Sequence, residues 1–256
     1  MKRVLTLAIA LALVALLAPV AMAQAPGGGL GNALSNLAEA NRIEGQTAGQ
    51  IIQLFGLLTV LAVAPGILIT ITSFTRFIIV FSILRSGLGL QTTPANLVLV
   101  SLALFMTFYV MQPAADRAWT EGLQPMMNNE ITQAEALDRI SAPFRDFMLQ
   151  NVRQEDIKLF VDLARERDPA YEQGDTPGWR VLVPAFMVSE LRRGFEIGFL
   201  VILPFLVIDL VVATITMAMG MMMLPPTVLA LPFKILFFIL IDGWNLLVGS
   251  MIRSFN

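Results

Sequence analysis

The sequence predicts an all-α membrane protein with a cleavable signal peptide, helical hairpins built from four hydrophobic segments, and a helical extracytoplasmic segment. The first observation behind this prediction is composition. Of the 256 residues, 56% are hydrophobic and 14% are charged, and the mean hydropathy is +0.73. Such a chain has too little polar sequence to cover a soluble core. The second observation is that long apolar runs alternate with charged or proline-containing sequence, as expected for helices that enter lipid.

The residue types that are missing narrow the possible functions. The chain has no cysteine and no histidine, which excludes disulfides, thiol catalysis and the commonest zinc and haem ligands. No nucleophile has a base at a credible spacing. The net charge is -2, and the charges are clustered without a nucleic-acid footprint. We therefore expect no enzyme, no cofactor or metal, and no nucleic-acid partner.

The N-terminus is typical of a secretory signal. A short basic stretch precedes an apolar run over 4–20, and Ala21-Met22-Ala23 forms an A-x-A cleavage site. We therefore expect residues 1–23 to be removed, and 24–49 to form a glycine-containing linker. An uncleaved transmembrane helix is the alternative, but Pro19 and the small residues near the end of the run favour the signal peptide.

The first hairpin is expected over 50–112. Residues 50–72 are almost continuously apolar and are long enough to cross a hydrocarbon core of about 30 Å. The next stretch is too polar to span lipid alone. Pro94 is expected near a helix start, and the run over 96–111 ends at the expected stop formed by Gln112 and Pro113.

Residues 113–195 carry most of the charges and form the expected extracytoplasmic segment. Thr132 and Glu135 have the spacing of a capping box, and apolar residues over 143–167 recur at helical intervals. Two or three amphipathic helices fit this pattern. Because an even number of spans follows a cleaved signal, both ends of the mature chain are expected on the extracytoplasmic side.

The second hairpin is expected over 196–256. Its two apolar runs, 197–219 and 228–252, are separated by the break at Pro225-Pro226. The loop over 217–226 contains five methionines within seven residues. Methionine side chains are flexible and polarisable, so they can close around contacts of different shape. The loop is therefore predicted to act as a gasket; the alternative is lipid-facing filler at a helix end.

Four ionisable residues lie within these apolar runs: Glu196, Asp209, Lys234 and Asp242. A charge in lipid is costly, so such groups usually face protein or water and mark a functional site, for example a proton or ion relay. The alternative is a buried ion pair between helices or subunits, formed by Asp209 with Lys234 or with Asp242. The sequence leaves both readings open.

Several ordered motifs carry a resemblance to a known family. In the second half of the chain they are 193–199, 204–211, 219–226, 231–234 and 242–244, and in the first half 73–77 and 87–94. Together they resemble the FliP family, the flagellar members of the type III secretion export-gate proteins. The resemblance covers nearly the whole mature chain.

The resemblance implies a pore-forming gate for unfolded flagellar proteins in the bacterial inner membrane, within the flagellar basal body. Five such subunits are expected to assemble with FliQ and FliR, alongside FlhB and FlhA of the same export apparatus. In this family the hairpins are lifted out of the membrane plane, so the four hydrophobic segments need not all cross lipid in the assembly. A virulence-type secretion gate is the nearer alternative, and a proton-coupled secondary transporter the more distant one.

The resemblance also implies roles for particular residues. The family's methionine gasket corresponds to Met221, Met222 and Met223, next to Met219. Glu190 corresponds to an acidic position beside the pore and subunit contacts, and Arg76 lies within a first-half motif. We expect these two residues, with the four ionisable residues above, to be intramembrane charges or subunit contacts.

Overall fold

The computed structural model describes residues 55–255 except 57, 60, 61, 64, 65, 68, 169, 170, 172, 173, 175 and 221–224. The chain divides into two compact units, Met1–Leu68 and Ile69–Asn256. The predicted signal peptide and linker lie outside the described residues. In the first unit the described residues between 55 and 67 are helical, and the Thr59 hydroxyl donates to the Phe55 carbonyl at 2.8 Å. The candidate site lies in the second unit.

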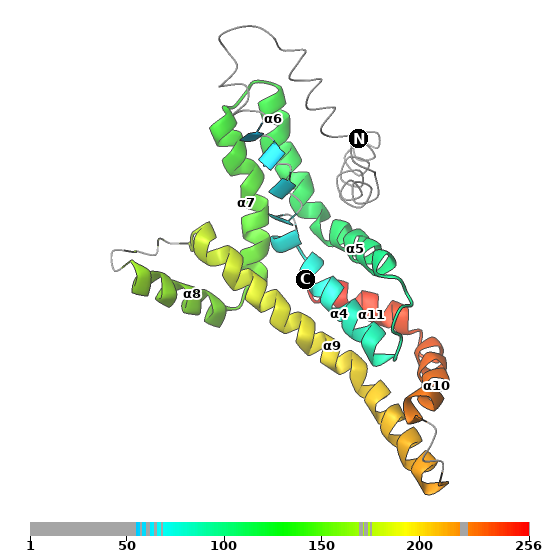
Figure 1. Cartoon of the computed structure of the whole chain (residues 1–256). Helices are drawn as coiled ribbons and strands as arrows, with labels where there is room; N and C mark the ends of the chain where they lie inside the picture. Colours follow the sequence, from blue (N-terminus) through cyan, green and yellow to red (C-terminus); the bar gives the residue numbers. More distant parts are fainter. Residues whose placement is uncertain are drawn as a thin grey trace. The chain divides into compact units, whose positions relative to one another are not determined.

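The second unit is helical throughout its described part, which confirms the predicted all-α class (Figure 1). Its elements are α4 (Phe74–Gly87), α5 (Asn96–Arg117), the π-helical segment η1 (Ala118–Leu123), α6 (Gln124–Met127), α7 (Gln133–Asn151), α8 (Gln154–Arg167), α9 (Trp179–Ala218), α10 (Pro226–Leu240) and α11 (Gly243–Arg253). No strand occurs among the residues that the structure describes.

Helix α9 is the element along which the others are arranged. Helices α8 and α7 pack on it, α4 makes its most extensive contact with it, and α10 folds back beside its last part (Figure 1). Two glycines allow the close approach of α4. A Cβ at Gly194 would lie 3.1 Å from Ile79, and one at Gly198 would collide with Ile83. The glycines of the 193–199 motif therefore serve helix packing.

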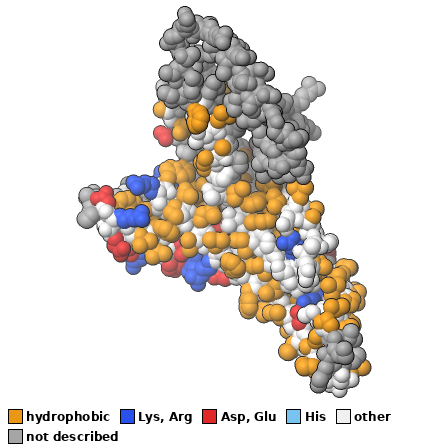
Figure 2. Space-filling model, viewed as in Figure 1, with side chains coloured by type: hydrophobic (Ala, Val, Ile, Leu, Met, Phe, Trp, Pro, Cys, Tyr) orange, Lys and Arg blue, Asp and Glu red, His pale blue; other side chains and the backbone are white. Residues whose placement is uncertain are grey.

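Helices α7 and α8 are the amphipathic helices predicted for the charged segment. The capping box is confirmed, because the Thr132 hydroxyl accepts a hydrogen bond from the Glu135 N–H at 3.3 Å. Buried residues such as Met148 and Val161 join residues of α9 in a separate hydrophobic cluster. Figure 2 shows charged side chains gathered around the α8 end, and apolar side chains over the end formed by α9 and α10.

The helix predicted to start at Pro94 begins two residues later, at Asn96, and the predicted stop at Gln112 and Pro113 is wrong. Helix α5 continues through Pro113 to Arg117. Proline removes one helical hydrogen bond and its ring crowds the preceding turn, but contacts of this part of the helix with η1 and α7 offset that cost. Asn96–Met127 is one of two described helical stretches that are long and apolar enough to cross a membrane, with a hydropathy of 1.8.

The other candidate span is α9, with a hydropathy of 2.6. It has 40 residues, which corresponds to about 60 Å, or twice the thickness of a hydrocarbon core. The helix is continuous across residues 195 and 196, where the charged segment was expected to end. The second half of α9 holds nearly all of the apolar run over 197–219, which is by itself long enough to cross lipid. The first half of the helix is therefore additional length that a membrane span does not require.

The last apolar run forms two helices where the sequence predicts one. Helices α10 and α11 meet at an angle of 63°. Asp242 lies between them with φ of 51°, in the left-handed region, and the ring of Phe238 occupies the space where a side chain at residue 243 would lie. The described residues therefore hold two candidate spans, or three if the bent pair is one span. Most of the first predicted segment, 50–72, falls in the other unit.

Candidate functional site

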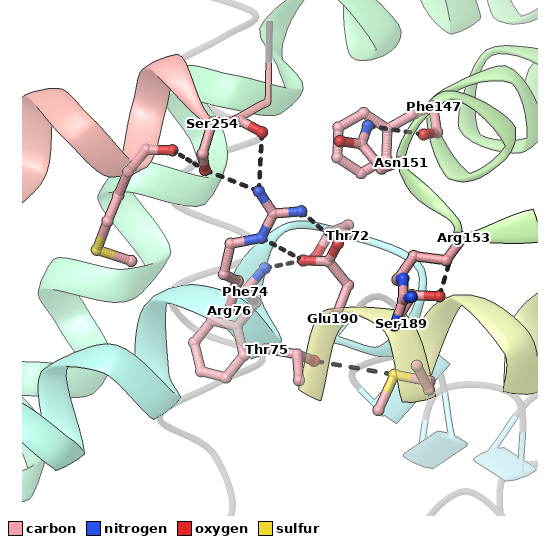
Figure 3. A network of polar contacts seen from close by, with 12 residues as sticks. Thr72, Phe74, Thr75, Arg76, Phe147, Asn151, Arg153, Ser189, Glu190 and Ser254 are labelled. Atoms are coloured by element: carbon pink, nitrogen blue, oxygen red, sulfur yellow. Dashed lines mark hydrogen bonds and ion pairs between the residues drawn. The ribbon is translucent and has the colours of Figure 1, made fainter. Parts of the chain in front are cut away.

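A fully buried ion pair joins α4 to α9 (Figure 3). Arg76 Nε donates to Glu190 Oε2 at 2.8 Å, and Arg76 Nη2 donates to Glu190 Oε1 at 2.5 Å. Both side chains are 0% exposed. This two-point geometry is the strongest that arginine and a carboxylate can form. The ion pair holds α4 and α9 together at this point.

The end of the chain completes the surroundings of Arg76. Arg76 Nη1 donates to the Ser254 carbonyl at 3.0 Å and to the Ser254 hydroxyl at 2.7 Å. The Phe255 ring lies 3.5 Å from the guanidinium carbon, and it also contacts the rings of Phe77 and Phe147. Residues of α9 and of the C-terminal end therefore contact one cation of α4 (Figure 3), and Phe147 of α7 stacks on the outer ring, Phe255.

The charge state of Arg76 follows from opposing effects. Burial lowers the pKa of its guanidinium from the ordinary value, and the hydrogen bonds and charge of Glu190 raise it. Arginine begins from so high a pKa that it remains protonated in proteins. Arg76 is therefore a permanent buried cation that requires the Glu190 carboxylate as its counterion.

A second set of polar contacts continues from Glu190 to α8. The Ser189 hydroxyl oxygen lies 2.5 Å from Asp156 Oδ2 and accepts a hydrogen bond from the Arg153 N–H at 3.1 Å. Ser189 and Asp156 are both buried. None of the residues predicted from sequence is Ser189, Asp156, Ser254 or Phe255. An acidic residue in the first turn of an amphipathic helix marks Asp156 only weakly, and nothing local marks the C-terminal pair.

Asp209 and Lys234 form the second ion pair. Lys234 Nζ lies 2.5 Å from Asp209 Oδ2 and 3.0 Å from the Gly87 carbonyl. The side chain of Asp209 is 31% exposed and that of Lys234 is 6% exposed. The pair lines a groove of about 780 Å³ between α4, α9 and α10, together with Ser86 and Thr227. Asp209 Oδ1 is buried and has no hydrogen-bond partner among the described residues.

Glu196 and Asp242 lie in different surroundings. Glu196 pairs with Arg192 on the same helix at 2.9 Å, and both side chains are more than half exposed. Asp242 accepts a hydrogen bond from the Asn245 side chain at 3.1 Å, at the break between α10 and α11. Within the described part of the chain, no hydrogen bond or ion pair joins either residue to Asp209 or Lys234. The structure brings together two of the four ionisable candidates.

The methionine loop begins where α9 ends. Gly220 adopts a φ of 73°, which ends the helix in the left-handed conformation common after helix C-termini. Met217 and Met219 are exposed. Met221, Met222 and Met223 lie outside the described residues, so their role as a gasket stays a prediction. Within the described residues, no group of three or more acidic side chains could hold a metal ion.

Comparison with known proteins identifies similar sequences. A family model described as the FliP family matches residues 57–251. The flagellar biosynthetic protein FliP of Agrobacterium fabrum is 67% identical over 215 residues, covering 84% of this chain and 88% of that protein. The protein of the same name from Rhizobium meliloti is 65% identical over 213 residues, covering 83% and 87%. That of Bacillus subtilis is 47% identical over 210 residues, covering 82% and 94%.

Proposed function

Because the chain belongs to the FliP family, we propose that it is a pore-forming subunit of the flagellar type III export gate. In this role it is a conduit and a closure for unfolded flagellar proteins that cross the bacterial inner membrane. The family consists of flagellar structural proteins and not of enzymes. Its relatives reported above are all named as flagellar proteins, which supports flagellar over virulence cargo.

One observation supports assembly with other subunits. The exposed face of α9 carries the Arg192–Glu196 ion pair, and the exposed apolar residues Leu191, Phe195 and Phe199 lie beside it on the same helix. Lipid tails cannot solvate an ion pair, so this face must meet protein or water. Water in turn does not suit the large apolar side chains around the pair. A protein interface satisfies both requirements, as in a homo-oligomeric ring with FliQ and FliR.

The closure is assigned to the methionine loop. The segment 217–226 begins at the end of α9, where Met217 and Met219 are exposed, and reaches α10 at Pro226. A ring of methionines from several subunits would exclude ions when the gate is idle and yield to an extended chain in transit. Energy would come from other parts of the export apparatus, which includes FlhA and FlhB. The chain itself would perform no bond chemistry.

The test is the mass of the particle purified from membranes after expression of the chain alone and with FliQ and FliR. We expect a discrete homo-oligomer, a pentamer in the proposed gate, that takes up both partners. The Arg192→Leu/Glu196→Leu double variant is expected to insert into the membrane but to assemble less well, because the polar groups that a neighbouring subunit would contact on this face are lost. A stable monomer that ignores the partners would refute the proposal.

The same purified particle distinguishes a proton-coupled transporter from an export gate. Its relay would need Asp209, Lys234, Asp242 and Glu196 to be connected, and the described contacts join only the first two. The purified chain in vesicles is therefore expected to conduct no substrate-coupled proton current. Such a current, lost on Asp209→Asn, would favour the transporter.

A further inference from the structure

Arg85 is a cation in the last turn of α4. Arg76, Lys234 and Arg192 each have a carboxylate partner on or beside the apolar helices. Arg85 has no carboxylate partner among the described residues. Its Nη1 donates to neutral oxygens, the Asn96 side chain and, at 3.4 Å, the Pro94 carbonyl. These bonds hold the guanidinium in place without neutralising it.

The same arginine lines an apolar pocket. The pocket has a volume of about 330 Å³ and lies between α4, the α4–α5 connection, α5, α10 and α11. Its apolar lining includes Phe81, Leu84, Leu99, Phe238 and Trp244. Arg85 is the one charged residue among the lining residues, and none of them is acidic. A ligand that fits this pocket therefore needs an apolar body and an anionic end.

The position of Arg85 along the candidate span matches a membrane interface. Asn96, to which Arg85 donates, is the first residue of the candidate span Asn96–Met127. Where this stretch crosses a membrane, the hydrocarbon region begins close to this guanidinium, and lipid headgroups lie at the same level. Trp244 is 40% exposed, and tryptophan favours this depth in membrane proteins.

The start of α5 adds a second source of positive potential. Ala95, its N-cap residue, provides no side-chain cap, so the first N–H groups of a 22-residue helix retain the partial positive charge that attracts anions. The Arg85–Asn96 hydrogen bond places the guanidinium beside this helix end. Two features of different origin thus favour a negative group at the same mouth of the pocket.

We propose that this pocket binds an anionic phospholipid, with part of one acyl chain in the pocket and the phosphate at Arg85 and the α5 N-terminus. Burial of methylene groups against the apolar lining stabilises the chain, and the headgroup supplies the counterion that the protein does not. The lipid would fasten the α4–α5 connection to the bend between α10 and α11. This inference rests on the stretch Asn96–Met127 crossing the membrane, and it does not rest on the gate function.

Lipid binding can be measured by native mass spectrometry of the delipidated particle, titrated with phosphatidylglycerol or phosphatidylcholine. Arg85→Gln is expected to weaken phosphatidylglycerol binding about fivefold, the effect of one basic residue at a membrane surface, and to leave phosphatidylcholine binding unchanged. Ile239→Trp replaces an exposed aliphatic side chain of the pocket wall by a bulkier aromatic ring. Because the ring would take up space needed by the acyl chain, this variant is expected to weaken phosphatidylglycerol binding while Arg85 is intact.

Arg180→Gln is the matched control, because Arg180 is an exposed cation that does not line the pocket. It is expected to bind phosphatidylglycerol as the parent chain does. Equal binding of phosphatidylglycerol by Arg85→Gln and the parent chain would overturn the proposal. So would full competition by inorganic phosphate, which would indicate an ion site without an acyl chain. If Arg85→Gln fails to assemble, unchanged binding by Ile239→Trp would overturn it instead.

Discussion

The ring of Phe255 lies over the guanidinium of Arg76, with 3.5 Å between the ring centroid and the guanidinium carbon. Phe255 is the penultimate residue of the chain, and Arg76 lies in the first turn of α4. Together with Ser254, the ring covers the side of Arg76 that Glu190 does not occupy. The partly buried C-terminal residues therefore pack against the buried ion pair that joins α4 to α9.

Phe255→Ala is expected to lower the free energy of unfolding by about 2 kcal/mol, because it removes a cation–π contact and two ring contacts. Thermal or denaturant unfolding of the purified chain in detergent measures this loss. Phe255→Trp retains an aromatic face and is the matched control, with most of the stability expected to remain. An alanine variant as stable as the parent chain would show that the C-terminus is dispensable for the core.

Glu190→Ala is expected to cost about 3–5 kcal/mol, because it leaves Arg76 buried without a counterion. Glu135→Ala is the matched control. Glu135 pairs with Arg139 at 2.6 Å, but both side chains are nearly half exposed, so its loss is expected to cost about 0.5 kcal/mol. The same unfolding measurement serves both variants.

Removal of both partners of the buried pair shows how much of the loss of stability comes from an unpaired charge and how much from lost packing. The double variant Arg76→Met/Glu190→Leu is expected to recover most of the stability that Glu190→Ala loses, since no unpaired charge remains. A double variant that is less stable than Glu190→Ala alone would contradict this account. It would mean that the hydrogen bonds of Arg76 to Ser254 contribute more than the ion pair.

Lys234→Met is expected to destabilise the chain by about 3 kcal/mol, because the carboxylate of Asp209 loses its partner in the groove. In a double-mutant cycle with Asp209→Asn, the two losses are expected to be less than additive. Thr227 lines the same groove without belonging to the pair. The control variant Thr227→Val is therefore expected to change stability by less than about 1 kcal/mol. Additive losses would argue that the two residues act separately.

Replacement of Met221, Met222 and Met223 by alanine is expected to increase ion leak through the membrane, because shorter side chains leave a gap in the closure. Conductance across membranes that contain the assembled particle, together with secretion of flagellar proteins, measures the effect. Met126→Ala/Met127→Ala alters two methionines of α6 and is expected to leave both readouts unchanged. Unchanged leak and secretion in the triple variant would refute the gasket.

Local sequence patterns were sufficient for the starts of two helices. The capping box predicted the start of α7, and the apolar run after Pro94 predicted the start of α5, because hydrogen-bonding groups and apolar periodicity act within a few residues. The end of α5 was misplaced, since tertiary contacts carry the helix past Pro113. The bend at Asp242 was missed for a related reason. It depends on a left-handed backbone and on the Phe238 ring beneath residue 243.

The sequence by itself determined that this protein is helical, apolar and free of histidine and cysteine chemistry, and its motifs indicated the family. Only the tertiary structure decided that Arg76 pairs with Glu190, 114 residues away, and that Lys234 selects Asp209 and not Asp242. The physical reason is that composition and periodicity act along the chain. Charge neutralisation acts through space, and several carboxylates were available to each cation until the helices packed.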